Sequence, residues 1–181
     1  MKHQTIDWAA LRILTLDDDF EFRAMVSGIL RKLGVASTPI AKNFEEAFWE
    51  IENTRVDVVI VNHEIKGGMG ITFAKQMRHP KDTPDPHRPI IMIAKKNDQS
   101  TLALAIQEGI DYLLIRPVTG ADISETITNL LTKPPSRIIT ATYVGPCRRR
   151  LPKHFYKHYQ GKERRQSPRG SNKENTQIRG L

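Results

Sequence analysis

The sequence predicts a doubly wound α/β fold, in which helices cover both faces of a five-stranded parallel sheet, followed by a basic, largely irregular C-terminal tail. Five short strand-like runs alternate with five segments whose apolar residues recur at helical spacing. The strand-like runs are mostly continuous in their apolar residues, and such strands need cover on both faces. Positive charge is concentrated behind the last helical segment.

The expected strands begin near the N-terminus and recur along the first two thirds of the chain. They comprise residues 12–16, 35–38, 57–61, 89–94 and 112–115. Ligands of open parallel sheets bind beyond the carboxyl ends of the strands. Those ends present Asp17 and Asp18, Asn62, Ala94 and Arg116. We therefore expect a candidate site among these five residues.

The expected helices follow the strands one by one. They comprise about residues 22–33, 44–52, 70–78, 102–108 and 121–131. Gly34 and Gly109 are suited to close the first and fourth helices. Asn43, with Glu46 three residues later, fits a capping box, and Thr119 fits the N-cap of the last helix.

Composition excludes several classes of protein. The chain has 181 residues, of which 39% are hydrophobic and 27% charged, as in ordinary globular proteins. Its longest apolar runs are far shorter than the roughly 20 residues of a membrane-spanning helix. The single cysteine, Cys147, excludes an internal disulfide framework and a four-cysteine zinc site. We expect a cytoplasmic protein without a membrane span.

The motifs at the strand ends resemble those of a known family. Leu14-Thr-Leu-Asp-Asp-Asp, Asp57-Val-Val-Ile-Val-Asn, the glycines of residues 67–70, Gly109-Ile-Asp-Tyr and Arg116-Pro together resemble a CheY-like response-regulator receiver. The resemblance covers about residues 10–131. It implies the flavodoxin-like strand order 2-1-3-4-5.

The resemblance also implies a lost phosphorylation site. A working receiver carries an aspartate nucleophile at the end of the third strand, Mg²⁺ held by first-strand acids, and a hydroxyl and a lysine on the phosphoryl oxygens. Here those positions hold Asn62, Ala94 and Arg116, and the aromatic switch position holds Leu113. A neutral amide is no carboxylate nucleophile, so we expect neither phosphorylation nor enzymatic activity.

Two questions at this site stay open in the sequence. Asp17 and Asp18 either retain weak Mg²⁺ binding or form a solvated acidic cluster paired with Arg116; we favour the second, because the third carboxylate is absent. Asn62 either mimics one signalling state or records a simple loss of chemistry.

Beyond the last helix the chain becomes strongly basic. Residues 1–135 hold 16 Lys and Arg against 18 Asp and Glu, a net charge of −2, whereas residues 136–181 hold 12 against two, a net charge of +10. We divide the chain into a pseudo-receiver (1–131), a linker with two prolines (132–137), an arginine-rich ligand-binding segment (138–166) and a disordered tail (167–181).

The arginine-rich segment contains a near-repeat. Tyr-x-Gly-x-x-Arg-Arg occurs twice, 16 residues apart, beginning at Tyr143 and at Tyr159. Arginine forks onto phosphate or onto guanine, and tyrosine offers a stacking face. Two such units suit a two-fold symmetric cyclic dinucleotide. The candidate ligand-binding residues are Arg137, Tyr143, Gly145, Pro146, Arg148, Arg149, Arg150, Tyr159, Gly161, Arg164 and Arg165.

This segment resembles the arginine-rich extension of the CheY-like Cle proteins. The resemblance covers about residues 137–165 and implies cyclic di-GMP as the ligand and the flagellar motor switch as the first candidate partner, with a histidine kinase second. Cys147 stands where that pattern has an acid, whereas Glu163 keeps an acid in the second unit. A thiol is a weak acceptor for guanine N–H groups, which leaves affinity and stoichiometry open.

Three functions follow from these features. The first is a non-phosphorylated adaptor that binds cyclic di-GMP and docks on a protein. The second is a regulator whose tail binds nucleic acid without sequence preference, with strong salt dependence. The third is a purely structural pseudo-receiver. We expect no cofactor and no metal, since the pair His154 and His158 is more simply incidental in a basic tail.

Overall fold

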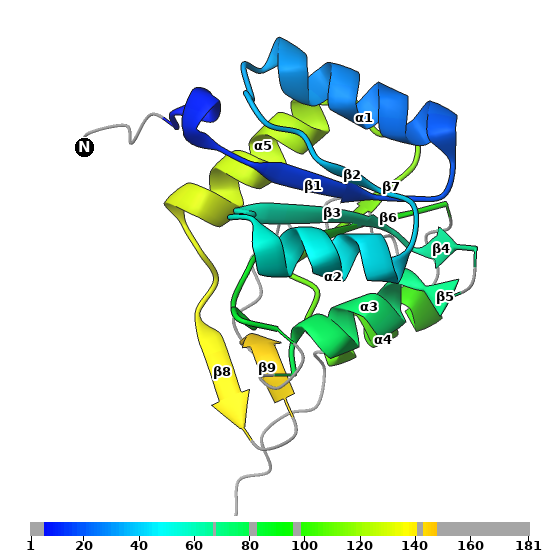
Figure 1. Ribbon diagram of the computed structural model, residues 1–181. Coiled ribbons are helices and arrows are strands. Elements are labelled where there is room, and N and C mark those ends of the chain that lie inside the picture. Colours follow the sequence, from blue (N-terminus) through cyan, green and yellow to red (C-terminus); the bar gives the residue numbers. More distant parts are fainter. Residues whose placement is uncertain (1–5, 67, 80–82, 96–98, 141–142, 148–181) are drawn as a thin grey trace, which may run out of the picture.

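Residues 6–66, 68–79, 83–95, 99–140 and 143–147 are described by the computed structural model (Figure 1). Five strands form one parallel sheet in the order β2-β1-β3-β6-β7. They are β1 (Ile13–Leu16), β2 (Ile40–Ala41), β3 (Val58–Asn62), β6 (Ile90–Ala94) and β7 (Tyr112–Ile115). Counted among themselves in chain order, these strands have the expected 2-1-3-4-5 arrangement. The predicted fold class of the body is confirmed.

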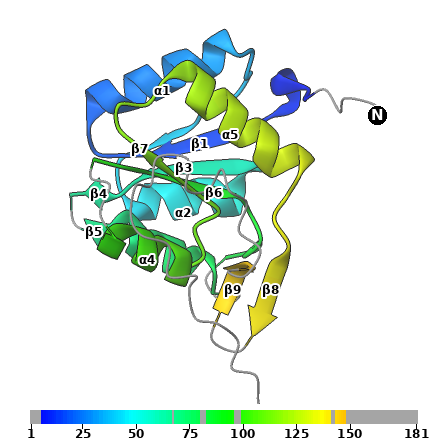
Figure 2. The ribbon, with the colours of Figure 1, turned by 180° about the vertical axis from the view of Figure 1, so that it is seen from behind.

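Helices cover both faces of this sheet (Figures 1 and 2). They are α1 (Phe20–Lys32), α2 (Phe44–Asn53), α3 (Gly70–Met77), α4 (Gln99–Gln107) and α5 (Gly120–Thr132). Helices α1 and α5 contribute to one apolar cluster and helices α2, α3 and α4 to the other. The three central strands are buried along their whole length, which explains their continuous apolar sequences. A short 3-10 helix, Trp8–Ala10, precedes β1.

Side-chain caps fix where the helices begin. Asp19 accepts hydrogen bonds from the first turn of α1. Thr119 is the N-cap of α5, as predicted, and it also forms a full capping box with Asp122. Asn43 accepts from the Glu46 amide, but the Glu46 carboxylate accepts from the amide of Lys42 instead of that of Asn43. The reciprocal bond of this box is therefore displaced by one residue.

The second strand was predicted at residues 35–38, and this placement is wrong. The structure has only an isolated bridge at Ser37 there, and β2 lies at Ile40–Ala41. Pro39 stands between them and has no N–H to donate to the sheet. Its carbonyl nevertheless accepts from Thr15 at 3.0 Å, so the chain runs along β1 and pairs only in part.

A small hairpin follows β3, where we expected a glycine-rich loop. Its strands are β4 (Glu64–Ile65) and β5 (Gly68–Met69). Gly70 begins α3 directly behind it, and a Cβ on Gly70 would collide with the backbone carbonyl of Asn62. This glycine thus permits the close approach of α3 to the end of β3.

A second hairpin follows α5 and lies below the body in Figure 1. Its antiparallel strands are β8 (Arg137–Thr140) and β9 (Tyr143–Pro146). Both strands fall in the region that we expected to be largely irregular, so that region contains regular structure at its beginning. The rest of that prediction concerns residues 148–181, which lie outside the described residues. In the part of the chain that the structure describes, no helix is long and apolar enough to cross a membrane.

Candidate functional site

The carboxyl ends of the strands meet at an open pocket of about 370 Å³, beside the β4–β5 hairpin. Asp17, Asp18, Asn62 and Arg116 all line it, as predicted, whereas Ala94 is buried at the end of β6. The lining residues are Asp17, Asp18, Asp19, Asn62, Glu64, Ile65, Lys66, Gly68, Met69, Lys95 and Arg116. Four carboxylates and three cations thus surround one depression.

Asp17 is the most buried of these carboxylates. Its side chain is fully enclosed, Oδ1 accepts from the amide of Asp19 at 2.9 Å, and Oδ2 lies 3.4 Å from Nη2 of Arg116. Burial raises the pKa of Asp17 above the usual value, although the Asp19 amide, the Asn62 side chain and Arg116 act in the opposite direction. Its backbone carbonyl accepts from the buried guanidinium of Arg23 at 2.6 Å.

Arg116 supplies the cation of this pair. Its guanidinium carbon lies 3.9 Å from the centroid of the Phe22 ring, and its side chain is 24% exposed. The aromatic face and the Asp17 carboxylate together hold this cation over the end of β1. The predicted pairing of Arg116 with the acidic cluster is therefore confirmed for Asp17.

The Asn62 side chain makes a hydrogen bond that requires its amide group. Its Nδ2 donates to the carbonyl of Glu64 at 2.7 Å, an interaction that a carboxylate cannot make. Its Oδ1 is buried and has no partner among the described residues. The side chain therefore supports the turn into β4 and offers no nucleophile.

The pocket does not fit the Mg²⁺ that the family's strand-end acids bind. Oδ2 of Asp17 faces Arg116, and Asn62 contributes a neutral oxygen where a third carboxylate is expected. Within the described residues, no three His, Cys, Asp or Glu side chains are grouped as metal ligands. We therefore derive no metal chemistry here.

Comparison with known proteins identifies the family of the receiver. Residues 13–128 match the response regulator receiver domain. The chain belongs to this family. Over 123 residues the receiver is 25% identical to chemotaxis protein CheY-3 of Vibrio cholerae, covering 68% of this chain and 93% of that protein. It is 23% identical to chemotaxis protein CheY of Pseudomonas aeruginosa, covering 68% and 98%.

Solved structures give the same result for the fold. The receiver superposes on a two-component response regulator of Clostridium difficile with a TM-score of 0.61 and 25% identity, covering 70% of this chain and 99% of that one. The TM-score against CheY4 of Vibrio cholerae is 0.59 at 23% identity, covering 66% and 97%. The β8–β9 hairpin lies beyond the residues that match the family.

The predicted ligand-binding residues lie elsewhere on the receiver or outside the described residues. Four of them belong to the β8–β9 hairpin: Arg137, Tyr143, Gly145 and Pro146. The hairpin contacts the receiver near the amino ends of the strands, whereas the pocket lies at their carboxyl ends. The other seven lie outside the described residues. They are Arg148, Arg149, Arg150, Tyr159, Gly161, Arg164 and Arg165.

A buried ion cluster joins the hairpin to the receiver, and sequence reasoning missed it. Oδ2 of Asp111 lies 2.6 Å from Nη2 of Arg78 at the end of α3, and Oδ1 lies 3.0 Å from Nη2 of Arg137 on β8. Asp111 also accepts from the Ile90 amide at 2.8 Å. A buried acid just before a strand signals that a cation is needed, but nothing in the sequence pattern identifies Arg137 as that cation.

Other lining residues of the pocket were also not singled out. Lys95 follows β6 directly and lies 3.5 Å from the carboxylate of Glu64, which begins β4. Lys66 lies in the turn of the β4–β5 hairpin. Their positions just beyond strand ends were the available signal, because that edge of a parallel sheet carries the site.

Proposed function

We propose that this receiver is a signalling adaptor without phosphoryl chemistry, and that cyclic di-GMP bound by its arginine-rich segment controls its docking on a protein partner in the cytoplasm. The observation that carries the proposal is the Asn62 amide, which donates to the Glu64 carbonyl, beside a pocket in which Arg116 pairs with Asp17. A receiver with these residues needs an input other than an aspartyl phosphate. It is a binding protein and not an enzyme.

The charge of the body argues against its pocket as the place for such a ligand. The pocket carries four carboxylates against three cations, so its lining is net negative and does not favour the phosphates of a dinucleotide. The segment behind the receiver carries the excess positive charge and both Tyr-x-Gly-x-x-Arg-Arg units. Electrostatics therefore favours capture of the anion by that segment.

The partner face that we propose is made by α4, β7 and α5. Leu104 on α4 is 44% exposed and would contribute one large apolar side chain to such an interface. The relatives named as chemotaxis proteins make the flagellar motor switch our first candidate partner, and a histidine kinase our second.

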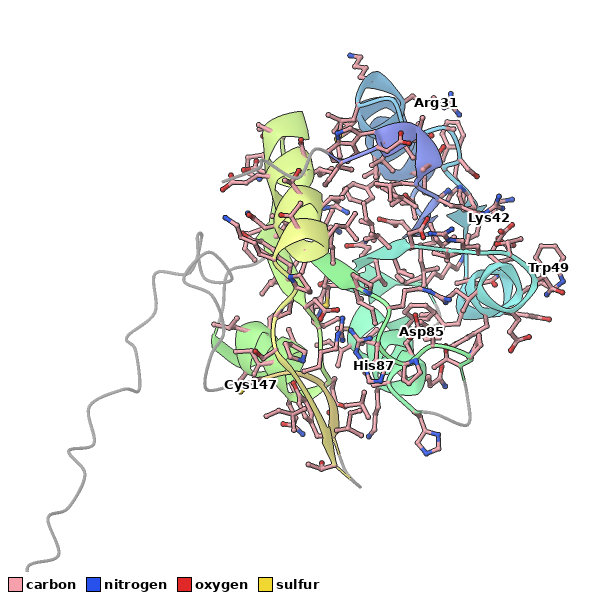
Figure 3. The ribbon with its side chains drawn as sticks, turned by 90° about the vertical axis from the view of Figure 1, so that its left-hand side faces the viewer. Arg31, Lys42, Trp49, Asp85, His87 and Cys147 are labelled. Carbon is pink, nitrogen blue, oxygen red and sulfur yellow. The ribbon has the colours of Figure 1, made fainter. Side chains whose placement is uncertain are left out.

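Calorimetric titration of cyclic di-GMP into the full chain at physiological salt tests the ligand. We expect micromolar to sub-micromolar binding, because ordering a segment offsets part of the interaction free energy. Arg148→Ala/Arg149→Ala should abolish it. The control Arg31→Ala/Arg55→Ala removes two exposed arginines from the receiver and should bind normally. Figure 3 places Arg31 far from Cys147, where the described part of the hairpin ends.

Failure of the full chain to bind would overturn the dinucleotide proposal. Titration with duplex DNA and RNA at two salt concentrations tests the alternative, a basic tail that binds nucleic acid without sequence preference. Such binding should weaken steeply as the salt concentration rises. Incubation with acetyl phosphate and Mg²⁺ tests the proposed absence of phosphoryl chemistry. Mass spectrometry of the incubated protein should show no phosphorylated receiver.

A further inference from the structure

The β8–β9 hairpin is held to the receiver so closely that it has a role of its own. We infer that Arg137 is a positioning residue: it clasps this hairpin to the turn between α4 and β7, and so fixes where the arginine-rich segment leaves the receiver. The clasp stands on geometry alone, whereas the identity of the positioned segment as a ligand site rests on the proposed function. Arg137 then has a different role from the arginines that we propose to bind the ligand.

The charges around Asp111 support this assignment. The Asp111 carboxylate is fully buried between Arg78 and Arg137, whose side chains are only 5% and 18% exposed. Arg78 also donates to backbone carbonyls, at 2.9 Å to Gly109 and at 2.7 Å to Arg88. Arg78 is thus committed within the receiver, and Arg137 brings the second cation from the hairpin. The Arg137 guanidinium is paired through Nη2, and its buried Nη1 has no partner among the described residues. Because the side chain is only 18% exposed, it offers little surface to a guanine or a phosphate.

Two glycines provide an independent observation. Gly109 ends the α4 turn with φ +78°, and a Cβ there would lie 2.5 Å from the carbonyl oxygen of Val144. A Cβ on Gly145 would lie 2.8 Å from the Cα of Gly109. The backbones of the hairpin and the turn therefore touch, which any side chain at either position would prevent. Val144 is 7% exposed, so apolar burial accompanies the contact.

Hydrogen bonds fix the end of the hairpin as well. The Tyr143 hydroxyl donates to the carbonyl of Pro146 at 2.7 Å and lies 3.5 Å from that of Ile106 on α4. The Cys147 amide donates to the carbonyl of Ser136 at 2.6 Å. This bond ties the end of β9 to the residue that precedes β8, and Figure 3 shows Cys147 on the opposite side of the molecule from Trp49.

The contacts of the hairpin couple the arginine-rich segment to the α4–β7 turn of the receiver. The carboxylate that holds Arg137 also holds the Ile90 amide at the start of β6 and directly precedes β7. A change in the position of the hairpin is therefore transmitted to the α4–β7 turn, at one end of the proposed partner face. A ligand favours partner binding through this connection only if it binds the two arrangements of the turn with different affinity.

The first test needs no ligand, because Cys147 is the only cysteine of the chain and reports on the hairpin. We compare the rate of thiol labelling in the full chain with Arg137→Ala, Gly145→Ala and the control Arg55→Ala. Cys147 is only partly buried in the docked hairpin, and local opening exposes it fully, so the first two variants should label measurably faster. Arg55→Ala removes an exposed arginine and should leave the rate unchanged. Arg137→Lys keeps a cation near Asp111 and should recover slow labelling. Equal rates in all variants would overturn the clasp.

The second test adds cyclic di-GMP and follows amide hydrogen exchange at residues 109–111. In the original chain the ligand should change exchange there, whereas in Arg137→Ala the ligand should still bind, within about threefold, without that change. Loss of binding in Arg137→Ala, with labelling of Cys147 still slow, would make Arg137 a ligand contact and overturn the inference. If the original chain binds no dinucleotide, the proposed function fails while the labelling result still decides the clasp.

Discussion

Replacing Asn62 by Asp restores the residue type of a phosphorylatable receiver and should destabilise this one. The change removes the 2.7 Å hydrogen bond to the Glu64 carbonyl, worth about 1 kcal/mol. It also buries a second carboxylate beside Asp17, and an uncompensated buried charge costs about 3 kcal/mol or more. We therefore expect the free energy of unfolding to fall by about 4 kcal/mol in the absence of divalent cations.

Urea denaturation followed by circular dichroism measures this loss. Asn53→Asp is a matched control, because Asn53 also donates to a backbone carbonyl, that of Trp49 at 2.8 Å, but is exposed. It should change stability by less than about 1 kcal/mol. Mg²⁺ at about 100 times its Kd should return about 2.7 kcal/mol to Asn62→Asp only, since the restored carboxylate completes an acidic set. If Asn62→Asp is as stable as Asn53→Asp without Mg²⁺, the argument from the Asn62 hydrogen bond is refuted.

Three further predictions concern the receiver. Burial raises the pKa of Asp17, so ionisation of this carboxyl weakens the native state at neutral pH. Asp17→Asn should therefore raise the free energy of unfolding near neutral pH, and the gain should fade as the pH falls and the native carboxyl takes up its proton. Urea denaturation at neutral and at acidic pH measures the difference. Phe73→Ala should lower stability by about 3–5 kcal/mol in the same assay, because this ring is fully buried between two aromatic neighbours. Gly70→Ala should destabilise, since the added Cβ meets the carbonyl of Asn62, whereas Gly28→Ala, in open space on α1, should raise the thermal midpoint through a gain of about 0.5–1 kcal/mol.

The sheet was largely predictable because its strands are buried on both faces. Continuous runs such as those that became β3 and β6 leave little choice of structure, and their carboxyl ends then identify the pocket. The prediction of the second strand was wrong for a local reason. At this edge of the sheet pairing is partial, and Pro39 interrupts the ladder just where the apolar pattern is weakest.

The β8–β9 hairpin was missed because its strands are short and lie in a region dominated by charge. Averaged over residues 136–181, the composition indicates a solvated basic tail. The structure instead pairs Arg137 with a buried carboxylate and buries Gly145 against Gly109. Such contacts depend on residues brought together only by the completed fold, and a charge count cannot distinguish a paired arginine from a free one.

The docked hairpin changes where the receiver can usefully be shortened. A chain ending at residue 131, the boundary that the sequence predicts, loses the second cation on Asp111 and uncovers the turn at Gly109. Comparing it with the full chain would mix damage to the receiver with loss of the ligand arginines. A fragment that ends after Cys147 keeps the hairpin in place, and removes only the segment whose binding is in question.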